Sequence, residues 1–363
     1  MSYLLAFLGF AALIILHEAG HFAAAKAVGM RVERFSLFFG PLLVKFRRGE
    51  TEYGIAPIPL GGYVKITGMS PREEIPPEIL PRAYYNQAVW KRIVVILAGP
   101  AVNFVLAFLL IVGVVLSTGA PVLRHGQPVA SMQLQALVAP ASQYLRSGDT
   151  LVAVDGRRGL PVGGITHQIA SHRCAGTPTP GCVAQTPVVL LVRRSGKLLS
   201  FTIPPRYDAS AKRMRVGFAF GVKTRSVGLP EASSQSVSQM WVVTTQTVSR
   251  IAKLFNAQDR KQIHGVVGGF KVTQQQFAFD TTAAIYTLAL ISLSLAIVNL
   301  FPFLPLDGGH IFWALAEKVR GKRIRFELME RAGVVGFLLI LALAYVGLSN
   351  DISTLTGSGF NTR

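Results

Sequence analysis

Charged residues are scarce in this sequence. Asp, Glu, Lys and Arg make up only 15% of the 363 residues, half of the residues are hydrophobic, and the mean hydropathy is +0.42. A soluble protein of two or three domains has more charge and less apolar character than this. The composition therefore indicates a membrane protein. Four apolar stretches approach the roughly 17 to 25 residues that a spanning helix needs, and they are residues 1–25, 93–116, 284–301 and 332–348.

Basic residues are absent from the first 25 positions. A secretory signal peptide begins with a basic segment and ends at a small-residue cleavage site, and neither flanks the first apolar stretch. We therefore interpret this stretch as a membrane span and not as a cleaved leader.

Elsewhere Lys and Arg are abundant and give the chain a net charge of +19. Eleven of them lie in residues 26–92 and six in residues 318–331, both next to predicted spans. Basic loops stay on the cytoplasmic side of a membrane, so these segments are predicted to be cytoplasmic and both termini to lie outside. Residues 118–283 then lie outside too, and their 19 basic residues do not oppose this, because long domains cross regardless of charge. The charge is thus explained without a nucleic-acid partner.

Cysteine is almost absent. Cys174 and Cys182, the two cysteines of the chain, lie in the segment predicted to be outside. A disulfide between them would close a small loop, and two unpaired surface thiols fit the sequence equally well. Neither interpretation assigns a metal to these residues.

The segments between the spans have recognisable patterns. Residues 36–69 alternate apolar and other residues around a glycine-containing turn, which predicts a β-hairpin beside the membrane, whereas residues 70–90 are rich in proline and charge, as linkers are. Residues 121–225 hold short β-type runs and predict a compact soluble domain. Residues 234–255 carry apolar side chains at helical spacing and predict an amphipathic helix, lying either on the membrane or on the soluble domain.

Small and polar residues occur within the second apolar stretch. Gly99, Ala101 and Asn103 are points at which another helix can approach closely, and we interpret them as packing positions.

Three polar residues interrupt the first apolar stretch. His17, Glu18 and His21 form the sequence HEAGH. On a helix, histidines four positions apart project from the same face and can bind one zinc ion, and the adjacent glutamate can accept a proton from a water molecule that the metal activates. HExxH is thus the signature of a metallopeptidase. Burying these groups at bilayer depth costs several kcal/mol by the lower estimates, which favours a functional site over a structural polar cluster.

A catalytic zinc site takes a third protein ligand and keeps one position for water. Asp307, in NLFPFLPLDGGH, follows the third span directly. Pro302 and Pro305 prevent a regular helix before it, and irregular backbone at membrane depth is tolerated where it is buried in protein or lines a wet cavity. Asp307 is therefore the first candidate, although LDGG alone is equally typical of a turn. His310 is the second candidate, because a helix that follows the glycines would place its side chain about one turn away from that of Asp307.

These motifs resemble the site-2 protease family of intramembrane zinc metalloproteases, and in particular its bacterial RseP-type branch. The similarity covers nearly the whole chain, through HEAGH, PLGGYVKITG in the following loop, AGPAVNFVLA in the second span and NLFPFLPLDGGHI at the third. VAPASQYLRSGDTLVAVDG, between the second and third spans, resembles the core of a PDZ domain. Some relatives have two PDZ domains, and this chain has room for one.

The resemblance implies an α-helical polytopic membrane protein of about four transmembrane helices, with a membrane-associated β-hairpin loop and an inserted β-rich PDZ-like domain. The expected parts are an N-terminal membrane core (1–118), the PDZ-like domain (121–225), an amphipathic membrane-surface segment (228–283), a C-terminal membrane core (284–349) and a tail (350–363).

The resemblance also implies the roles of individual residues. It implies one zinc ion per chain, bound by His17, His21 and Asp307, with Glu18 as the general base. Residues implied to contact substrate are Asn299, on the substrate backbone, and those of a hairpin at 40–69 that adds a strand to an unwound substrate segment, among them Gly61, Gly62 and Tyr63.

The family's usual substrate is a single-span membrane protein, such as an anti-sigma factor already cut on its outer side by a site-1 protease, or a remnant signal peptide. The resemblance thus implies regulated intramembrane proteolysis in a bacterial cytoplasmic membrane, with the active site near the cytoplasmic side and the PDZ-like domain excluding untrimmed substrates by bulk.

Three rival functions are a membrane-anchored protease with a water-exposed zinc site, an inactive scaffold and a metal transporter. HEAGH inside a span opposes the first and the intact Glu18 the second, while the absence of His, Asp, Glu and Cys from residues 93–116 and 332–348 opposes the third.

Overall fold

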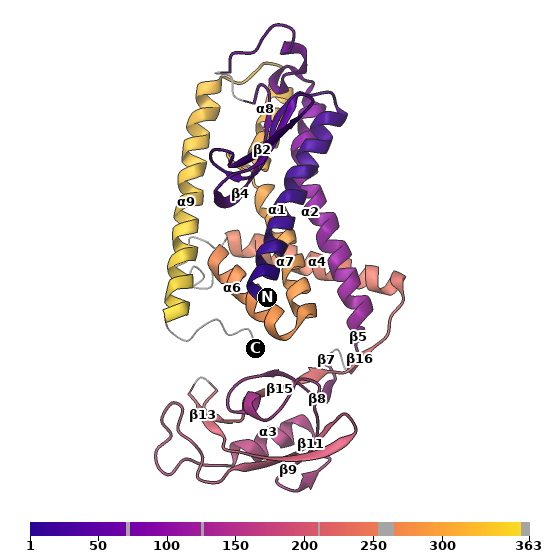
Figure 1. Cartoon of the computed structure of the whole chain (residues 1–363), viewed down its shortest axis with the longest axis vertical. Coiled ribbons are helices and arrows are strands. Elements are labelled where there is room, and N and C mark those ends of the chain that lie inside the picture. Colours follow the sequence, from indigo (N-terminus) through magenta and orange to yellow (C-terminus); the bar gives the residue numbers. More distant parts are fainter. Residues whose placement is uncertain (70–72, 125–126, 210, 253–264, 357–363) are drawn as a thin grey trace. The chain divides into compact units, whose positions relative to one another are not determined.

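The computed structural model of the chain describes residues 1–69, 73–124, 127–209, 211–252 and 265–356. Its contacts divide the chain into two compact units. The first unit joins Met1–Ser117 to Gly228–Thr362, and the second is Thr118–Val227. Helices make up most of the first unit, and strands are the main secondary structure of the second (Figure 1).

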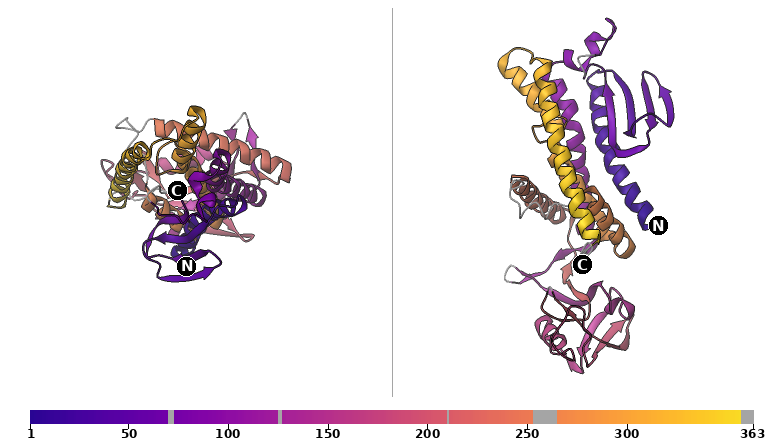
Figure 2. Two further views of the ribbon diagram at one scale, coloured as in Figure 1. Left: turned by 90° about the horizontal axis from the view of Figure 1, so that it is seen from above. Right: turned by 90° about the vertical axis from the view of Figure 1, so that its left-hand side faces the viewer.

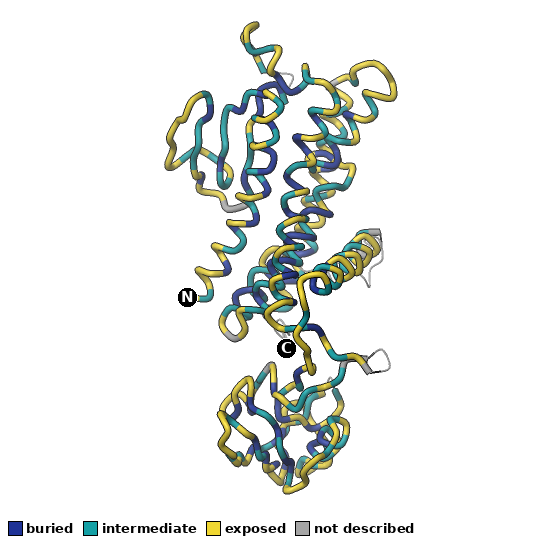
Figure 3. The backbone as a smooth tube through the Cα atoms, turned by 90° about the vertical axis from the view of Figure 1, so that its right-hand side faces the viewer, coloured by how far each residue is buried: buried dark blue, intermediate teal, exposed yellow. Residues whose placement is uncertain are grey.

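Among the described residues, four helices of the first unit are long and apolar enough to cross a membrane, and they contain most of each of the four predicted spans. They are α1 (Ser2–Ala27), α2 (Val89–Thr118), α7 (Thr281–Asn299) and α9 (Phe326–Thr356). Many of their large apolar side chains are exposed, while buried residues lie where the helices face one another (Figure 3). An apolar outer surface of this kind is what a lipid-facing helix presents.

The last helix is longer than its apolar pattern predicts. α9 continues through residue 356, so the first part of the predicted tail is helical, and residues 357–363 lie outside the described residues. The fully buried Asp351 side chain accepts hydrogen bonds from the backbone N–H groups of Gly265 at 3.0 Å and Gly268 at 2.7 Å. These groups begin helix α6 (Val266–Phe279). Asp351 therefore caps a neighbouring helix, so the charge ends the apolar run without ending α9.

Within its described residues, the predicted surface segment 228–283 contains helices α4 (Leu229–Ala252) and α6 and the first turn of α7. α6 packs against α1, and the rings of Phe270 and Phe10 lie 5.8 Å apart. α4 runs across the direction of the apolar helices (Figure 1). Met240 and Val243 of α4 pack on buried residues of α2 and α7, so the buried side of α4 contacts two of the apolar helices.

A four-stranded sheet lies against α1, on the side that faces away from α2 (Figures 1 and 2). Its order is β2-β3-β1-β4, with β1 and β3 parallel and the other neighbours antiparallel. The sequence predicted a hairpin, and the structure contains an antiparallel pair, β2 and β3, around the turn at Gly49 and Glu50. This pair belongs to a larger sheet because a strand that begins before the predicted segment pairs with two others. The strands are β1 (Val32–Phe39), β2 (Val44–Arg48), β3 (Thr51–Ile55) and β4 (Ile58–Ile66).

Aromatic packing joins this sheet to α1. The ring of Phe22 in α1 lies 5.5 Å from that of Phe35 in β1 and 5.8 Å from that of Tyr53 in β3. Between the sheet and α2, the predicted linker contains two 3-10 turns. They are Leu80–Arg82 and Tyr84–Asn86.

The second unit is a β-rich domain with one helix. Its main sheet has the order β12-β11-β9-β8-β15, with β10 beside β9, and the core beneath it includes the fully buried Leu134, Leu190 and Ile203. The main elements are β8 (Ala130–Leu137), β9 (Thr150–Val154), β10 (Arg157–Arg158), α3 (Val162–Ala170), β11 (Val188–Arg194), β12 (Lys197–Ile203) and β15 (Phe218–Val222). The short paired strands are β5 (Ala120–Pro121), β6 (Leu123–Arg124), β7 (Gln127–Pro128), β13 (Arg206–Asp208), β14 (Arg213–Arg215) and β16 (Thr224–Arg225).

Two side-chain links stabilise the loops of the second unit. Asp149 accepts hydrogen bonds from Arg194 Nε at 2.8 Å and Nη2 at 2.7 Å, and the Arg194 guanidinium lowers the pKa of the Asp149 carboxyl against the opposing effect of burial. Cys174 and Cys182 form a disulfide. Of the two interpretations that the sequence left open for these cysteines, the structure has the bonded one.

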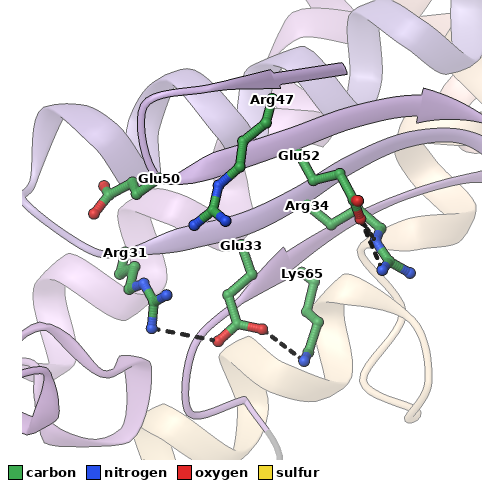
Figure 4. Close-up of a pocket in the computed structure, with 7 residues that line it drawn as sticks. All are labelled: Arg31, Glu33, Arg34, Arg47, Glu50, Glu52 and Lys65. Atoms are coloured by element: carbon green, nitrogen blue, oxygen red, sulfur yellow. Dashed lines mark hydrogen bonds and ion pairs between the residues drawn. The ribbon is translucent and has the colours of Figure 1, made fainter. Parts of the chain in front are cut away.

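The four-stranded sheet of the first unit also carries a charged pocket of about 340 Å³. Its lining residues are Arg31, Glu33, Arg34, Arg47, Glu50, Glu52 and Lys65 (Figure 4). Glu50, in the turn between β2 and β3, accepts hydrogen bonds from Lys26 Nζ at 2.7 Å and from Arg82 Nη1 and Nη2 at 2.9 and 2.7 Å. Lys26 is in the last turn of α1, so these ion pairs tie the sheet to that helix.

The Glu50 ion pairs predict a pH-dependent stability. Hydrogen bonds from Arg82 and Lys26 lower the pKa of Glu50 to about 2, from an ordinary value of 4.5. A depressed pKa stabilises the folded state above about pH 4.5, and this contribution is lost as the pH falls toward 2. We expect Glu50→Gln to lower the free energy of unfolding by about 1 kcal/mol near pH 7, because the partners are partly exposed and screened. The difference between the thermal midpoints of the two proteins in detergent, measured from about pH 7 to pH 3, should narrow steadily below about pH 4.5. A constant difference would contradict the assignment.

Candidate functional site

Two glycines allow α1 and α2 to approach closely. A Cβ atom at Gly20 would lie 2.6 Å from the carbonyl oxygen of Ala98, and one at Gly99 would lie 2.2 Å from His21 Nε2. No side chain fits at such distances, so both positions require glycine. As a result the HEAGH face of α1 lies directly against α2, and His17 and His21 are each only 7% exposed.

Asp307 reaches this place as the first residue of α8 (Asp307–Arg320). Cβ atoms at Gly308 and Gly309 would lie 2.2 Å and 2.5 Å from backbone atoms of Leu300 and Leu304. The two glycines of LDGG therefore let α8 begin directly against the turn that follows α7. This close start brings the Asp307 carboxylate to the histidines of α1.

Three ligand atoms converge there. His17 Nε2 and His21 Nε2 are 3.3 Å apart, and Asp307 Oδ2 lies 3.3 Å from each. Among the described residues, these form the one group of three or more His, Cys, Asp or Glu side chains with ligand atoms close enough to hold a metal ion. His310, the second candidate from the sequence, does not belong to the group.

The spacing of these atoms fits a tetrahedral metal ion. Ligand atoms about 2.0 to 2.1 Å from a zinc ion are separated from one another by about 3.3 Å in tetrahedral geometry, which is the separation observed for all three pairs. Two imidazole nitrogens and one carboxylate oxygen also form a donor set of catalytic zinc sites, with a fourth position left for water. Within the part of the chain that the structure describes, the buried Asp307 Oδ2 has no hydrogen-bond partner.

Groups on α2 orient both histidine rings. His21 Nδ1 lies 2.9 Å from the carbonyl oxygen of Val95, and His17 Nδ1 lies 3.1 Å from the side-chain amide of Asn103. Metal-binding histidines characteristically make such a bond through the nitrogen that does not bind the metal. The sequence pattern indicated only a packing role for Asn103. The available signal was its spacing, because Asn103 is four residues after Gly99 and therefore shares its helix face.

The edge strand β4 lies beside Glu18. A Cβ atom at Gly62 would lie 3.0 Å from Glu18 Cγ, so glycine allows the strand to reach α1. The backbone N–H of Val64 is a hydrogen-bond donor to the Glu18 carboxylate. The N–H of Val64 points away from β1, the neighbouring strand. The side of β4 that pairs with no strand in this sheet therefore faces Glu18.

The other residues that the resemblance implies for substrate contact are in different surroundings. The Asn299 amide nitrogen lies 3.5 Å from His17 Nε2, within the candidate metal site. The Tyr63 hydroxyl accepts a hydrogen bond from Arg34 at 2.9 Å, and its ring stacks on Phe39. Gly61 has a φ of +136° and also lies against the Phe39 ring.

Comparison with known proteins adds a family. The family described as Peptidase family M50 matches residues 5–343. The chain is similar to zinc metalloprotease Rip1 of Mycobacterium tuberculosis, at 30% identity over 92% of this chain and 90% of the relative, and to Rip1 of Mycolicibacterium smegmatis, at 32% identity over 93% and 90%. A relative from Nostoc sp. is 31% identical over 98% of this chain and 97% of its own length.

The contact between Gly99 and His21 predicts the effect of one methyl group. Gly99→Ala would place a Cβ atom 2.2 Å from His21 Nε2, so the ring must leave its position. We expect zinc affinity to fall by about 100-fold or more, since displacing a ligand costs at least as much as losing one of its outer partners. Zinc content after dialysis against graded chelator measures this.

Gly113→Ala is the matched control for this variant. Gly113 is in the same helix, and apart from the nearby backbone of that helix and its two chain neighbours no described atom lies within 4 Å of its Cβ position. It should retain wild-type zinc affinity. Equal affinity in Gly99→Ala and the wild type would show that His21 does not bind metal in this orientation.

Proposed function

This chain belongs to peptidase family M50, the site-2 protease family, and is a zinc metalloprotease with four apolar helices; we propose that it is an intramembrane endopeptidase that cleaves single-span membrane proteins. The observation that carries the proposal is the location of two converging ligands. His17 and His21 lie within a 26-residue apolar helix long enough to span a bilayer, together with Glu18. Burying polar groups in such a helix is costly, so their presence indicates a functional site.

We assign His17, His21 and Asp307 as the ligands of one zinc ion per chain. Their common 3.3 Å spacing, their burial and the absence of another partner for Asp307 Oδ2 among the described residues support this assignment. When bound, zinc lowers the pKa of water toward neutrality and polarises a carbonyl group. The protein fixes the donors, and Val95 and Asn103 hold the two imidazole rings.

Glu18 is the general base of the proposed reaction. Its carboxylate lies between the histidines of its own helix and the β4 edge, where it can accept a proton from the attacking water. It then transfers that proton to the amide nitrogen as the peptide bond breaks. Asn299, at 3.5 Å from His17 Nε2, is close enough to the ligands to hold the substrate backbone there.

The edge of β4 is the proposed substrate-binding element. A helix hides its amide groups in internal hydrogen bonds, so a protease must unwind the target segment before cleaving it. Addition of that segment to a sheet edge supplies new partners for each freed N–H and C=O group. β4 is such an edge and approaches Glu18 through Gly62.

We assign the basic segments 26–92 and 318–331 to the cytoplasmic side of a bacterial cytoplasmic membrane. The second unit then lies outside, where the Cys174–Cys182 disulfide fits an oxidising compartment. We infer that this unit is PDZ-like and excludes substrates with bulky outer domains. Substrates would then be proteins already trimmed by a site-1 protease, such as an anti-sigma factor, or remnant signal peptides.

Replacement of Glu18 tests the catalytic assignment. Glu18→Gln keeps the size of the side chain and leaves all three proposed ligands, so we expect about one zinc ion per chain and a loss of cleavage of about 10²-fold to 10⁴-fold. Cleavage of a tagged single-span protein without its outer domain is followed on gels, with zinc measured in the same samples. Glu78→Gln, at an exposed position, is the control and should cleave normally. Undiminished cleavage by Glu18→Gln would reject the proposed function.

Cross-linking tests strand addition. The protease carries Glu18→Gln to prevent cleavage, serine at positions 174 and 182, and Tyr63→Cys on β4. It is mixed with a series of substrates, each with one cysteine at a different position of the segment to be cleaved. Because strand side chains alternate between faces, we expect disulfides at every second substrate position. Lys45→Cys on β2, at the opposite edge of the sheet, should give none. Uniform cross-linking along the segment, or none from β4, would contradict strand addition.

A further inference from the structure

We propose that Asn103 is a positioning residue that keeps His17 in the one tautomer able to bind zinc. The inference rests on the proposed function, since it concerns the zinc ligand His17, and it gives a role to a residue that the sequence explained only by packing. Asn103 is fully buried, and its amide lies 3.1 Å from His17 Nδ1.

His21 shows what a zinc-binding imidazole needs here. Its Nδ1 lies 2.9 Å from the carbonyl oxygen of Val95. A carbonyl can only accept a hydrogen bond, so Nδ1 of His21 carries the proton. In a neutral ring the other nitrogen, Nε2, then has a free lone pair, and this atom faces Asp307 and His17. The backbone of α2 thus fixes the tautomer of His21.

His17 needs the same tautomer, because its Nε2 is the atom that lies 3.3 Å from Asp307 Oδ2. Its Nδ1 must therefore donate a hydrogen bond, and the partner must be an acceptor. The group in that position is the Asn103 side chain, which offers an oxygen that accepts and a nitrogen that donates. Only the oxygen is compatible with a metal on Nε2.

The amide can meet this requirement by a half turn about its last bond. With the nitrogen toward His17, Asn103 Oδ1 is buried and has no hydrogen-bond partner within the described residues. A half turn exchanges two atoms of similar size and places Oδ1 against the Nδ1–H of His17. It pairs the Asn103 oxygen with a donor, as a metal on Nε2 of His17 requires, and moves the amide nitrogen to the place that the oxygen held.

The backbone of Asn103 is held within helix α2 itself, independently of the side chain and of its neighbours on other helices. Ser292 Oγ, on α7, donates a hydrogen bond of 3.0 Å to the Asn103 backbone carbonyl oxygen. One turn earlier, Gly99 gives room to His21. A single face of α2 therefore contacts both histidines of HEAGH. Gly99 leaves space for the His21 ring, and Asn103 provides the acceptor for His17.

The test uses the full-length protein in detergent and zinc itself as the probe. Asn103→Leu keeps a similar shape but removes the acceptor, and we expect zinc affinity to fall by about 10-fold to 100-fold, as is usual for outer partners of metal-binding histidines. Asn103→Asp supplies an oxygen in either orientation and should restore most of that loss. Ser292→Ala, which removes the neighbouring hydrogen bond, should bind zinc as the wild type does. Affinities come from competition with a chelator, and thermal midpoints of the metal-free proteins report folding.

The possible outcomes separate the inference from the function beneath it. If the wild type binds zinc and Asn103→Leu binds it equally well, Asn103 does not position His17 and the inference is overturned, while the proposed function stands. Loss of affinity in Asn103→Asp or Ser292→Ala equal to that in Asn103→Leu would also overturn it, by showing a merely structural role. If Asn103→Leu does not fold, Asn103→Ala removes the amide without added bulk and is judged in the same way. A wild type without zinc overturns both proposals.

Discussion

The convergence of three buried ligand atoms is the constraint on which the centre of the first unit depends. His17 Nε2, His21 Nε2 and Asp307 Oδ2 lie 3.3 Å from one another, on side chains that are only 9 to 17% exposed. Water cannot reach them freely, and unpaired buried acceptors cost several kcal/mol. A cation at the proposed zinc site would turn this arrangement into an attraction, because all three atoms can bind it. Metal binding and the packing of these helices are therefore parts of one equilibrium.

Other contacts hold the helices that bring these atoms together. Gly20 and Gly99 remove the side chains that would separate α1 from α2. At the far end of α8 from Asp307, Glu317 accepts a hydrogen bond of 3.0 Å from Arg92 Nη1 of α2, and its other oxygen lies 2.9 Å from Arg92 Nη2; Arg92 is 7% exposed. A buried ion pair is weak evidence for stability, but it is costly to break by removing one partner. Here it fixes how α8 sits on α2 and therefore where Asp307 points.

The parts of this arrangement that follow from local spacing could be predicted from the sequence. His17 and His21 share a helix face because they are four residues apart, and the four spans follow from runs of apolar residues. The choice between Asp307 and His310 could not be settled from spacing, since it depends on how closely α8 begins against the preceding turn. The role of Asn103 depends on which face of α2 meets α1, which apolar periodicity does not define.

Long-range pairing sets a further limit on prediction. The parallel pairing of β1 with β3 turns a simple hairpin into a sheet, and alternation along one strand says nothing about its neighbours. In the same way, Asp351 ends an apolar run but not α9, because its partners are backbone groups more than 80 residues away.

The edge of this sheet matters because of what unwinding costs in a membrane. Each backbone group freed from a substrate helix loses its partner in a place without water, at a cost of several kcal/mol. Unwinding is tolerable only where new partners are already in position, and the free edge of β4 offers them beside Glu18. Glu50 and the packing of Phe22 fix that sheet to the helix that carries the histidines. The strand that would bind an unwound segment and the residues that would cleave it are thus held on the same helix, α1, so a substrate that extends along the edge meets the ligands without further rearrangement.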